Sequence, residues 1–159
     1  MIPVRVKEIA FDLAMNPVLL LIDEAETSIL PIWVGPLEAQ SIAIALESGT
    51  PPRPLTHDLI KTLFEQLKAT LTHVVITDVH EGTYYAQMHI TREDTSTVID
   101  ARPSDAVAIA LRSMAPIFIT DKVARYTLSA AEVYNNAANE RTCPFAENQA
   151  KDTSKKTVH

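Results

Sequence analysis

The chain has very few of the residues on which several common kinds of site depend. Three glycines in 159 residues leave no glycine-rich phosphate loop, and the single cysteine, Cys143, has no partner for an intramolecular disulfide or a zinc knuckle. No apolar run reaches the roughly 18 to 20 residues that cross a bilayer. The first residues, MIPVRVKEIAFDL, lack the pattern of a secretory signal peptide. We therefore expect a cytoplasmic protein with no membrane partner.

Positive charge is also scarce. The 14 lysines and arginines are outnumbered by 20 aspartates and glutamates, which gives a net charge of -6 at pH 7. Proteins that bind nucleic acid through their overall charge neutralise several phosphates with clustered Lys and Arg. The composition argues against that class, so any contact with a polyanion has to be local. The dense lysine cluster of Lys151, Lys155 and Lys156 lies in a stretch with almost no apolar residues, for which we expect disorder.

Hydrophobic residues, in contrast, are plentiful. They make up 47% of the chain, which suffices for a real core in one domain of this length. We expect that domain to span 1–125, followed by a polar C-terminal extension over 126–159 that is partly helical or disordered. Alternating and β-branched patterns predict strands near 3–13, 17–23, 29–34, 72–80, 83–91, 96–100 and 116–120. Helices are predicted from Pro36 to a closing Gly49, over 55–69 with one apolar face, and over 102–114.

The two halves of the chain resemble each other. IAIALES at 42–48 matches VAIALRS at 107–113, and a similar offset superposes Ile32 on Ile99 and Pro36 on Pro103. Each half is then a strand-strand-strand-helix unit, which indicates an ancient duplication. Because neither half-sheet can bury its apolar face alone, we expect one α+β domain with a mostly antiparallel sheet packed with helices.

One turn distinguishes the halves. Where the first has PIWVGPLEAQ, the second has VIDARPSDA, with Asp100, Arg102 and Asp105 at the matching turn. Pro103 suits the first position of a helix, and Asp105 complements the positive end of the helix dipole. Folding does not demand Asp100 and Arg102, since the first half does without charges there. The alternative is a simple salt bridge between them, which stabilises little when exposed.

A second polar group opens the helix predicted over 55–69. Thr56 is expected to be the N-cap, with Leu55 and Ile60 as a hydrophobic staple and Asp58 favoured by the helix dipole. His57 gains nothing from that position, because a protonated imidazole opposes the dipole. A neutral imidazole there suits a general base or a metal ligand, and an ordinary surface histidine is the alternative.

The chain contains four ordered motifs, LPIWVGPLEAQSIAIALE at 30–47, RPLTHDL at 53–59, EGTYYA at 81–86 and IDARPSDAVAIALR at 99–112. Together they resemble the bifunctional nuclease family. The resemblance runs from about residue 4 to residue 120 and is absent after about residue 125. It implies a compact α+β domain that cleaves both DNA and RNA.

For such a reaction the chain offers carboxylates, a histidine and two arginines. Phosphodiester hydrolysis needs activated water and positive charge at the phosphate, and Mg²⁺ or Mn²⁺ held by carboxylates near an arginine supplies both. No spacing-defined metal motif is present, so the metal is predicted from the inventory of residues alone. The predicted catalytic residues are His57, Asp58, Asp100 and Asp105, the predicted metal ligands are Asp58, Asp100, Asp105 and Glu38, and the predicted substrate-binding residues are Arg53 and Arg102.

A second hypothesis belongs to another class of protein. In it the polar groups only rigidify helix starts, and the protein is a non-enzymatic oligomeric ligand-binding or scaffold module. The acidic composition and the missing metal motif favour this alternative. Under either hypothesis, the helices at 39–46 and 106–111 are apolar nearly all round, which indicates burial on two sides. We expect part of that burial to be against another subunit, hence a homo-oligomer, with a dimer favoured.

Other polar and aromatic residues are expected to have ordinary structural roles. His89 alternates with Tyr85 and Gln87 and is predicted to face solvent from a strand, as are His73 and His80. Trp33 lies in a strongly apolar strand and is predicted to belong to the core or a subunit interface.

Overall fold

A computed structural model describes residues 1–138 of the protein, and its secondary structure is α+β, as predicted. All seven predicted strands and all three predicted helices are present, with further elements toward the C-terminal end. The strands are β1 (Ile2–Phe11), β2 (Pro17–Asp23), β3 (Ser28–Trp33), β4 (Ala69–His80), β5 (Thr83–Arg92), β6 (Thr95–Ala101), β7 (Ile117–Ile119) and β8 (Leu128–Ser129). The helices are α1 (Pro36–Leu46), α2 (Thr56–Gln66), α3 (Pro103–Ser113), α4 (Asp121–Ala124) and α5 (Ala130–Ala138).

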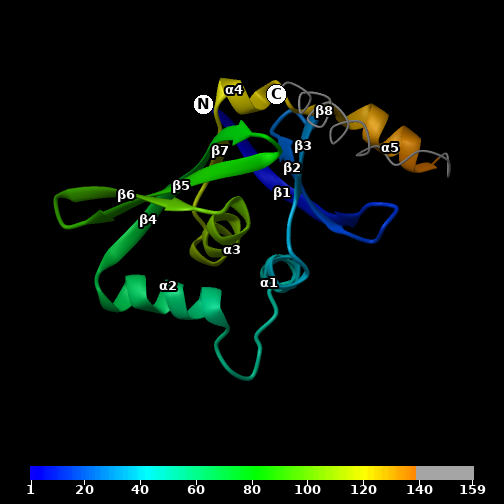
Figure 1. The fold of residues 1–159 in the computed structure, drawn as a ribbon. Coiled ribbons are helices and arrows are strands. Elements are labelled where there is room, and N and C mark those ends of the chain that lie inside the picture. The colour runs from blue at the N-terminus through cyan, green and yellow to red at the C-terminus, as the bar shows by residue number, and fades with distance from the viewer. Residues whose placement is uncertain (139–159) are drawn as a thin grey trace, which may run out of the picture.

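The strands form a single sheet in the order β6-β5-β4-β7-β1-β2-β3-β8 within the described residues (Figure 1). Every pair of neighbours is antiparallel except β4 and β7, which are parallel. Short β7 therefore joins the two three-stranded halves, β1 to β3 and β4 to β6. The mostly antiparallel sheet is thus confirmed, while the duplication of the two halves stays a prediction.

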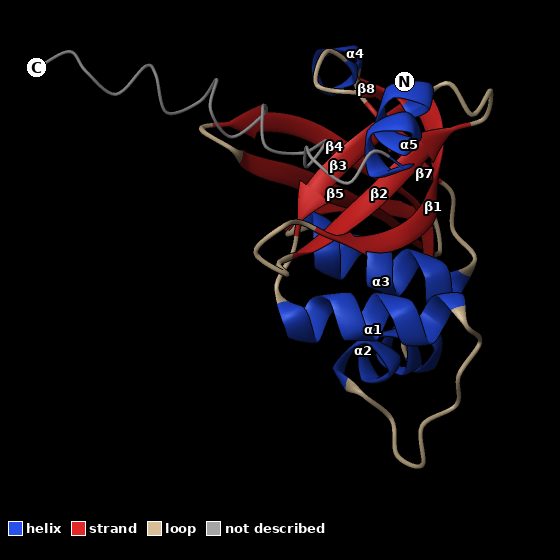
Figure 2. Ribbon diagram, turned by 90° about the vertical axis from the view of Figure 1, so that its right-hand side faces the viewer, coloured by secondary structure: helices blue, strands red, loops and turns tan. Residues whose placement is uncertain are grey.

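Helices α1, α2 and α3 lie together on one face of the sheet (Figure 2). Both faces of the sheet are covered at strand β2, because its residues 17–22 are buried whichever way they point. Leu19 and Leu21 face the larger core beneath the three helices. Val18 and Leu20 face a smaller core on the other side, which α5 covers with Val133. Alternate residues of an unbroken apolar strand thus supply two separate cores.

Helix α3 is the central helix of the covered face. Its residues 106–110 are at most 2% exposed, because the sheet lies on one side of the helix and α1 and α2 pack against it. Burial on two sides, predicted from the sequence, is therefore confirmed for α3 and is achieved within one chain. In α1 only Ala39, Ser41 and Ile42 are buried.

Three predicted helix ends are wrong by one to three residues. Helix α2, predicted to reach residue 69, ends at Gln66, and Ala69 already belongs to β4. The N-cap of α2 is Leu55, with extended φ and ψ, and Thr56 is already helical. The start is stabilised instead by Asp58, whose Oδ2 accepts a hydrogen bond from the Leu55 N–H at 2.8 Å. At the end of α1 the left-handed position belongs to Ser48, with φ of 53°, and the N–H of Gly49 bonds the carbonyl of Ile44. Gly49 therefore follows the left-handed residue that ends the helix.

The apolar face of α2 is only half covered. Ile60 and Phe64 pack against the larger core, whereas Leu59, Leu63 and Leu67 are 53%, 49% and 56% exposed. The periodicity of the sequence identified this face correctly, but it could not tell which part of it the chain itself buries.

His73 and His89 are half-buried, although the strand pattern predicted that they face solvent. Their rings stack at a centroid distance of 4.1 Å, and the edge of Phe118 meets His73. Burial, followed by the charge of His89, lowers the pKa of His73. Trp33 belongs to the smaller core, as predicted, and donates from Nε1 to Asp12 at 3.1 Å.

Beyond residue 125 the chain adds β8 to the sheet edge beside β3 and packs α5 on the smaller core. The boundary between domain and extension at 125 stays a prediction. Cys143 and the predicted lysine cluster lie outside the described residues. Among residues 1–138, no helix has the length and apolar character that crossing a membrane requires.

Candidate functional site

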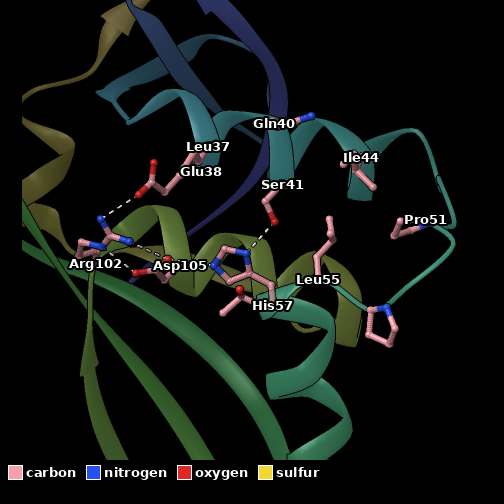
Figure 3. Close-up of a pocket in the computed structure, with 12 residues that line it drawn as sticks. Leu37, Glu38, Gln40, Ser41, Ile44, Pro51, Leu55, His57, Arg102 and Asp105 are labelled. Carbon is pink, nitrogen blue, oxygen red and sulfur yellow. Dashed lines mark hydrogen bonds and ion pairs between the residues drawn. The ribbon is translucent and has the colours of Figure 1, made fainter.

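Helices α1 and α3 begin in the same way. Each starts with proline after an extended N-cap residue, Gly35 in α1 and Arg102 in α3, and each has a carboxylate in its first turn. Both carboxylates bond the guanidinium of Arg102. Its Nη1 donates to Glu38 at 3.0 Å, while Nε and Nη2 donate to the two oxygens of Asp105 at 2.7 and 3.1 Å. Arg102 therefore holds the two helix starts together (Figure 3).

These contacts shift the ionisation of the groups that make them. Asp105, and then Glu38, raise the pKa of Arg102. Burial alone would raise the pKa of Asp105, but the hydrogen bonds and charges of Arg102 and His57 outweigh it, and that pKa is lowered. Gly35 leaves room for this arrangement, since a Cβ at that position would collide with the carboxylate of Glu38.

His57 lies between α1 and α3 in the first turn of α2 and is only 8% exposed. Its Nε2 is 2.9 Å from Oδ1 of Asp105, and its Nδ1 is 2.6 Å from Oγ of Ser41 (Figure 3). Asp105 and Ser41 lie 48 residues after and 16 residues before it in the chain. The alternative of a surface histidine is therefore wrong, because both ring nitrogens are engaged in a buried contact between three helices.

A second arginine completes the cluster from the far end of α3. The side chain of Arg112 is 7% exposed, and its Nε donates to Asp58 at 2.6 Å. Nη1 donates to the carbonyl of Ala108, and Nη2 lies 3.2 and 3.1 Å from the carbonyl and hydroxyl oxygens of Ser41. The hydrogen bond from Leu55, together with Arg112, lowers the pKa of Asp58. A continuous chain of hydrogen bonds thus runs from Arg112 through Ser41, His57 and Asp105 to Arg102.

A pocket of about 720 Å³ opens over this chain of contacts. One part of its wall is polar and includes His57, Asp105 and Arg102. The other part is aliphatic and comes from α1 and from the loop that precedes α2. The polar lining is Glu38, Gln40, Ser41, Thr56, His57, Arg102 and Asp105, and the apolar lining is Leu37, Ile44, Pro51, Pro54 and Leu55.

The structure brings together four of the seven residues predicted from the sequence: Glu38, His57, Arg102 and Asp105. Asp58 is close by, but its side chain pairs with Arg112 and does not line the pocket. Asp100 is exposed on the edge strand β6, opposite Gln87 of β5, and the predicted partner of an Asp100 salt bridge, Arg102, pairs elsewhere.

Arg53, the remaining predicted residue, is exposed on the loop between Pro51 and Pro54, which both line the pocket. It therefore lies beside the rim of the pocket and is not part of the lining.

The predicted metal ligands do not converge. Within residues 1–138, no three His, Cys, Asp or Glu side chains are grouped so that they could hold a metal ion. Glu38 and Asp105 are both paired with Arg102, and Asp58 is paired with Arg112. In this arrangement the predicted set does not fit a resident Mg²⁺ or Mn²⁺, which would need several free oxygen ligands. A metal requirement stays a prediction.

Ser41 and Arg112 were not identified from the sequence. Ser41 directly precedes the apolar stretch of α1, and Arg112 directly follows the apolar stretch of α3. A polar side chain at the border of an apolar stretch needs a partner if it is buried. This need for a partner was the one feature of the sequence that could have pointed to Ser41 and Arg112, although it does not identify the partner.

A buried histidine bonded to a carboxylate, next to a guanidinium in an open pocket, is an arrangement that can transfer protons beside a bound anion. The class defined by fold and site is an α+β domain whose pocket contains a histidine, carboxylates and an arginine. Comparison with known proteins is more specific. The bifunctional nuclease domain matches residues 18–132, and the chain belongs to this family.

The chain is also similar to individual proteins, of which the two plant relatives are named bifunctional nucleases. The chain is 46% identical over 121 residues to an uncharacterized protein of Mycobacterium tuberculosis, a match that covers 76% of this chain and 72% of the relative. It is 26% identical over 112 residues to Bifunctional nuclease 1 of Oryza sativa subsp. japonica and, to the same extent, to Bifunctional nuclease of Oryza minuta. Those matches cover 69% of this chain and 34% of the plant proteins.

Proposed function

We propose that this protein is a nuclease that hydrolyses phosphodiester bonds of both DNA and RNA in the pocket between α1, α2 and α3. The observation that carries the proposal is the position of His57, which is buried, bonded to Asp105 and adjacent to Arg102 in that pocket. Membership of a nuclease domain family supports the same reaction class. We place this activity in the cytoplasm, as the sequence predicts.

Arg102 is the group that binds the scissile phosphate. A guanidinium has five N–H donors, and three of them are used by Glu38 and Asp105. The two that remain, on Nη1 and Nη2, are free to donate to two phosphate oxygens in a bidentate contact. The side chain is 65% exposed, yet held by its carboxylates, so little conformational entropy is lost when the phosphate binds. Arg53 at the rim adds a second positive charge.

His57 and Asp105 supply the proton transfer. In its neutral form the imidazole has an N–H on one ring nitrogen and a basic lone pair on the other. The contact with Asp105 decides which nitrogen carries the hydrogen. Since a carboxylate with a lowered pKa only accepts, Nε2 must be the nitrogen that donates to it. Nδ1 is then the basic nitrogen, on the side of the pocket where Ser41 lies. Asp105 also stabilises the imidazolium that forms when Nδ1 takes a proton.

The aliphatic part of the wall accounts for a broad substrate range. Leu37, Ile44 and Pro54 offer an apolar surface against which a base or sugar can pack. Aliphatic side chains have no donors or acceptors for reading base edges, so binding there depends little on sequence.

The proposal is tested with end-labelled single-stranded DNA and RNA, with and without EDTA. We expect His57→Ala and Asp105→Asn each to lower the cleavage rate by about 10² to 10⁴-fold, the range for loss of an acid–base group. Arg102→Gln should lower it by about 10² to 10³-fold, the range for loss of a donor to the charge of the transition state. The matched control is Asp94→Asn, an acidic residue on the exposed turn between β5 and β6, which should cleave like the wild type. Thermal melting of each variant separates loss of activity from loss of folding.

Equal residual cleavage by the wild type and the three pocket variants would identify a contaminant and overturn the proposal. The EDTA series answers a separate question. Loss of wild-type cleavage in EDTA, restored by Mg²⁺ or Mn²⁺, is what the predicted metal requirement demands, and unchanged cleavage would contradict it.

A further inference from the structure

We propose that Ser41 is the nucleophile of the cleavage reaction, which then passes through a covalent intermediate between Ser41 and the phosphate. This inference rests on the proposed nuclease function and deepens it. Ser41 Oγ, His57 and Asp105 form a serine–histidine–carboxylate series with separations of 2.6 and 2.9 Å.

The direction of the hydrogen bonds follows from the groups at the two ends of the series. Arg112 can only donate, so the Ser41 oxygen accepts from its Nη2 at 3.1 Å. At the other end Asp105 accepts, which places the hydrogen of the neutral imidazole on Nε2. The lone pair of Nδ1 is therefore left to accept the single hydroxyl hydrogen of Ser41.

This arrangement decides which group the base can activate. Both nitrogens of His57 are engaged, one with Asp105 and one with Ser41, and the residue is only 8% exposed. A water molecule has no open position on Nδ1 unless it displaces the hydroxyl. The proton closest to the basic nitrogen is that of Ser41, and a serine bonded to a base that a third group orients is the geometry of an activated nucleophile.

The surroundings of Ser41 favour its alkoxide form as well. Arg112 donates to the same oxygen, and because its side chain is 7% exposed, solvent does little to screen that charge. Ser41 lines the pocket, and Glu38, which bonds Arg102, lies on the same side of α1, one turn earlier (Figure 3). A phosphate bound to Arg102 therefore lies on the side of the pocket that Ser41 lines, about one helical turn along α1 from the serine, a rise of roughly 5 Å.

The reaction balances in two steps. In the first, the Ser41 proton moves to Nδ1 of His57, Oγ forms a bond to phosphorus, and the P–O bond to the leaving nucleotide breaks, with that oxygen taking the proton from His57. In the second, water attacks phosphorus while Nδ1 takes one of its protons. The Ser41–phosphorus bond then breaks, and the proton returns to Oγ. One water is consumed per bond cleaved.

A nucleophile supplied by the protein explains how one site can cleave both polymers. Attack by Ser41 makes no use of the ribose 2′-hydroxyl, which DNA lacks. The same two steps therefore apply to DNA and RNA, and RNA whose 2′-hydroxyls are methylated should remain a substrate.

The decisive measurement is the stereochemistry at phosphorus, followed with a chiral phosphorothioate diester and the wild-type protein. Two successive displacements give net retention, whereas direct attack by water gives inversion. We also expect acid quenching during turnover to trap labelled nucleotide on the protein, with the label on the peptide that contains Ser41.

Variants add a second line of evidence. Ser41→Ala should lose at least about 10³-fold in rate, as loss of a serine nucleophile does elsewhere, and should trap no label. The matched control is Ser104→Ala, since Ser104 is buried to the same extent in α3 but does not line the pocket. It should keep both cleavage and trapping.

The outcomes separate the two proposals. Cleavage by the wild type with inversion, or undiminished cleavage by a folded Ser41→Ala, leaves the nuclease function standing and overturns the role of Ser41. A wild type that cleaves neither polymer, with or without added Mg²⁺ or Mn²⁺, overturns both.

Discussion

Arg112→Met is the substitution that most directly tests how the site is held together. It keeps a long side chain at the position but removes every hydrogen bond that the guanidinium makes to Asp58, Ala108 and Ser41. Within residues 1–138, Asp58 then keeps only the N–H of Leu55 as a hydrogen-bond partner. The guanidinium of Arg112 joins α3 to both other helices of the pocket, so we expect its removal to reduce stability as well as to disturb the geometry of the site.

The size of the expected loss in the free energy of unfolding follows from the burial of the Arg112–Asp58 ion pair. Removing one partner of a buried ion pair costs about 3 to 5 kcal/mol, because the other charge is left uncompensated. Asp58 is 30% exposed and can be partly hydrated, so we take the lower end, about 3 kcal/mol. For a domain of this size that corresponds to a fall in Tm of about 6 to 12 °C.

The assay is equilibrium urea unfolding of four proteins: the wild type, Arg112→Met, Asp58→Asn and the double variant. We expect a lower midpoint with an unchanged m-value for Arg112→Met, and a much smaller effect of Arg112→Met once Asp58 is already neutral. A loss of less than about 0.5 kcal/mol, the size of an ordinary surface change, would refute the reasoning. Strict additivity of the two single changes would refute it equally.

Two further predictions concern pH and assembly. The pKa values of Asp58 and Asp105 are lowered by folding, so the stability they contribute is complete above the ordinary aspartate value of 3.8 and is lost as pH falls through the lower folded values. Urea midpoints should therefore drop below about pH 4, and less steeply in Asp58→Asn; an equal slope in both proteins would contradict this. We also propose a homodimer, as the sequence predicts, but with its interface on the exposed Leu59 and Leu63 of α2 and not on the helices at 39–46 and 106–111. Light scattering should show a dimer for the wild type and a monomer for Leu63→Glu, and a wild-type monomer would contradict it.

Local patterns were enough to predict most of the fold. Alternating and β-branched apolar patterns predicted the strands, and Pro36 and Pro103 marked the starts of α1 and α3 because a missing N–H costs nothing there. Where prediction missed, the cause was a competing local contact. Asp58 accepts the N–H of Leu55, and this contact, rather than the hydroxyl of Thr56, supports the start of α2.

The candidate site was predictable only in part. His57 was singled out because a histidine gains nothing in the first turn of a helix. From the sequence, Asp100 and Asp105 were equally suitable candidates for a catalytic carboxylate. Only the structure distinguishes them, because Asp105 contacts His57 while Asp100 lies on the edge strand β6. The signal for Ser41 was weak, because a serine beside an apolar stretch needs a partner if it is buried, but the sequence does not say which partner.

By itself, then, the sequence determined the kinds of element, their order and the family to which the chain belongs, because periodicity and motifs are properties of neighbouring residues. It also determined that two helices begin at proline with a carboxylate in the first turn. Tertiary structure alone decided that Ser41, His57 and Asp105, which come from three helices, lie within 2.9 Å of one another in succession. The physical reason is that α3 is buried between the sheet and the other two helices, and this packing fixes contacts between residues far apart in the chain.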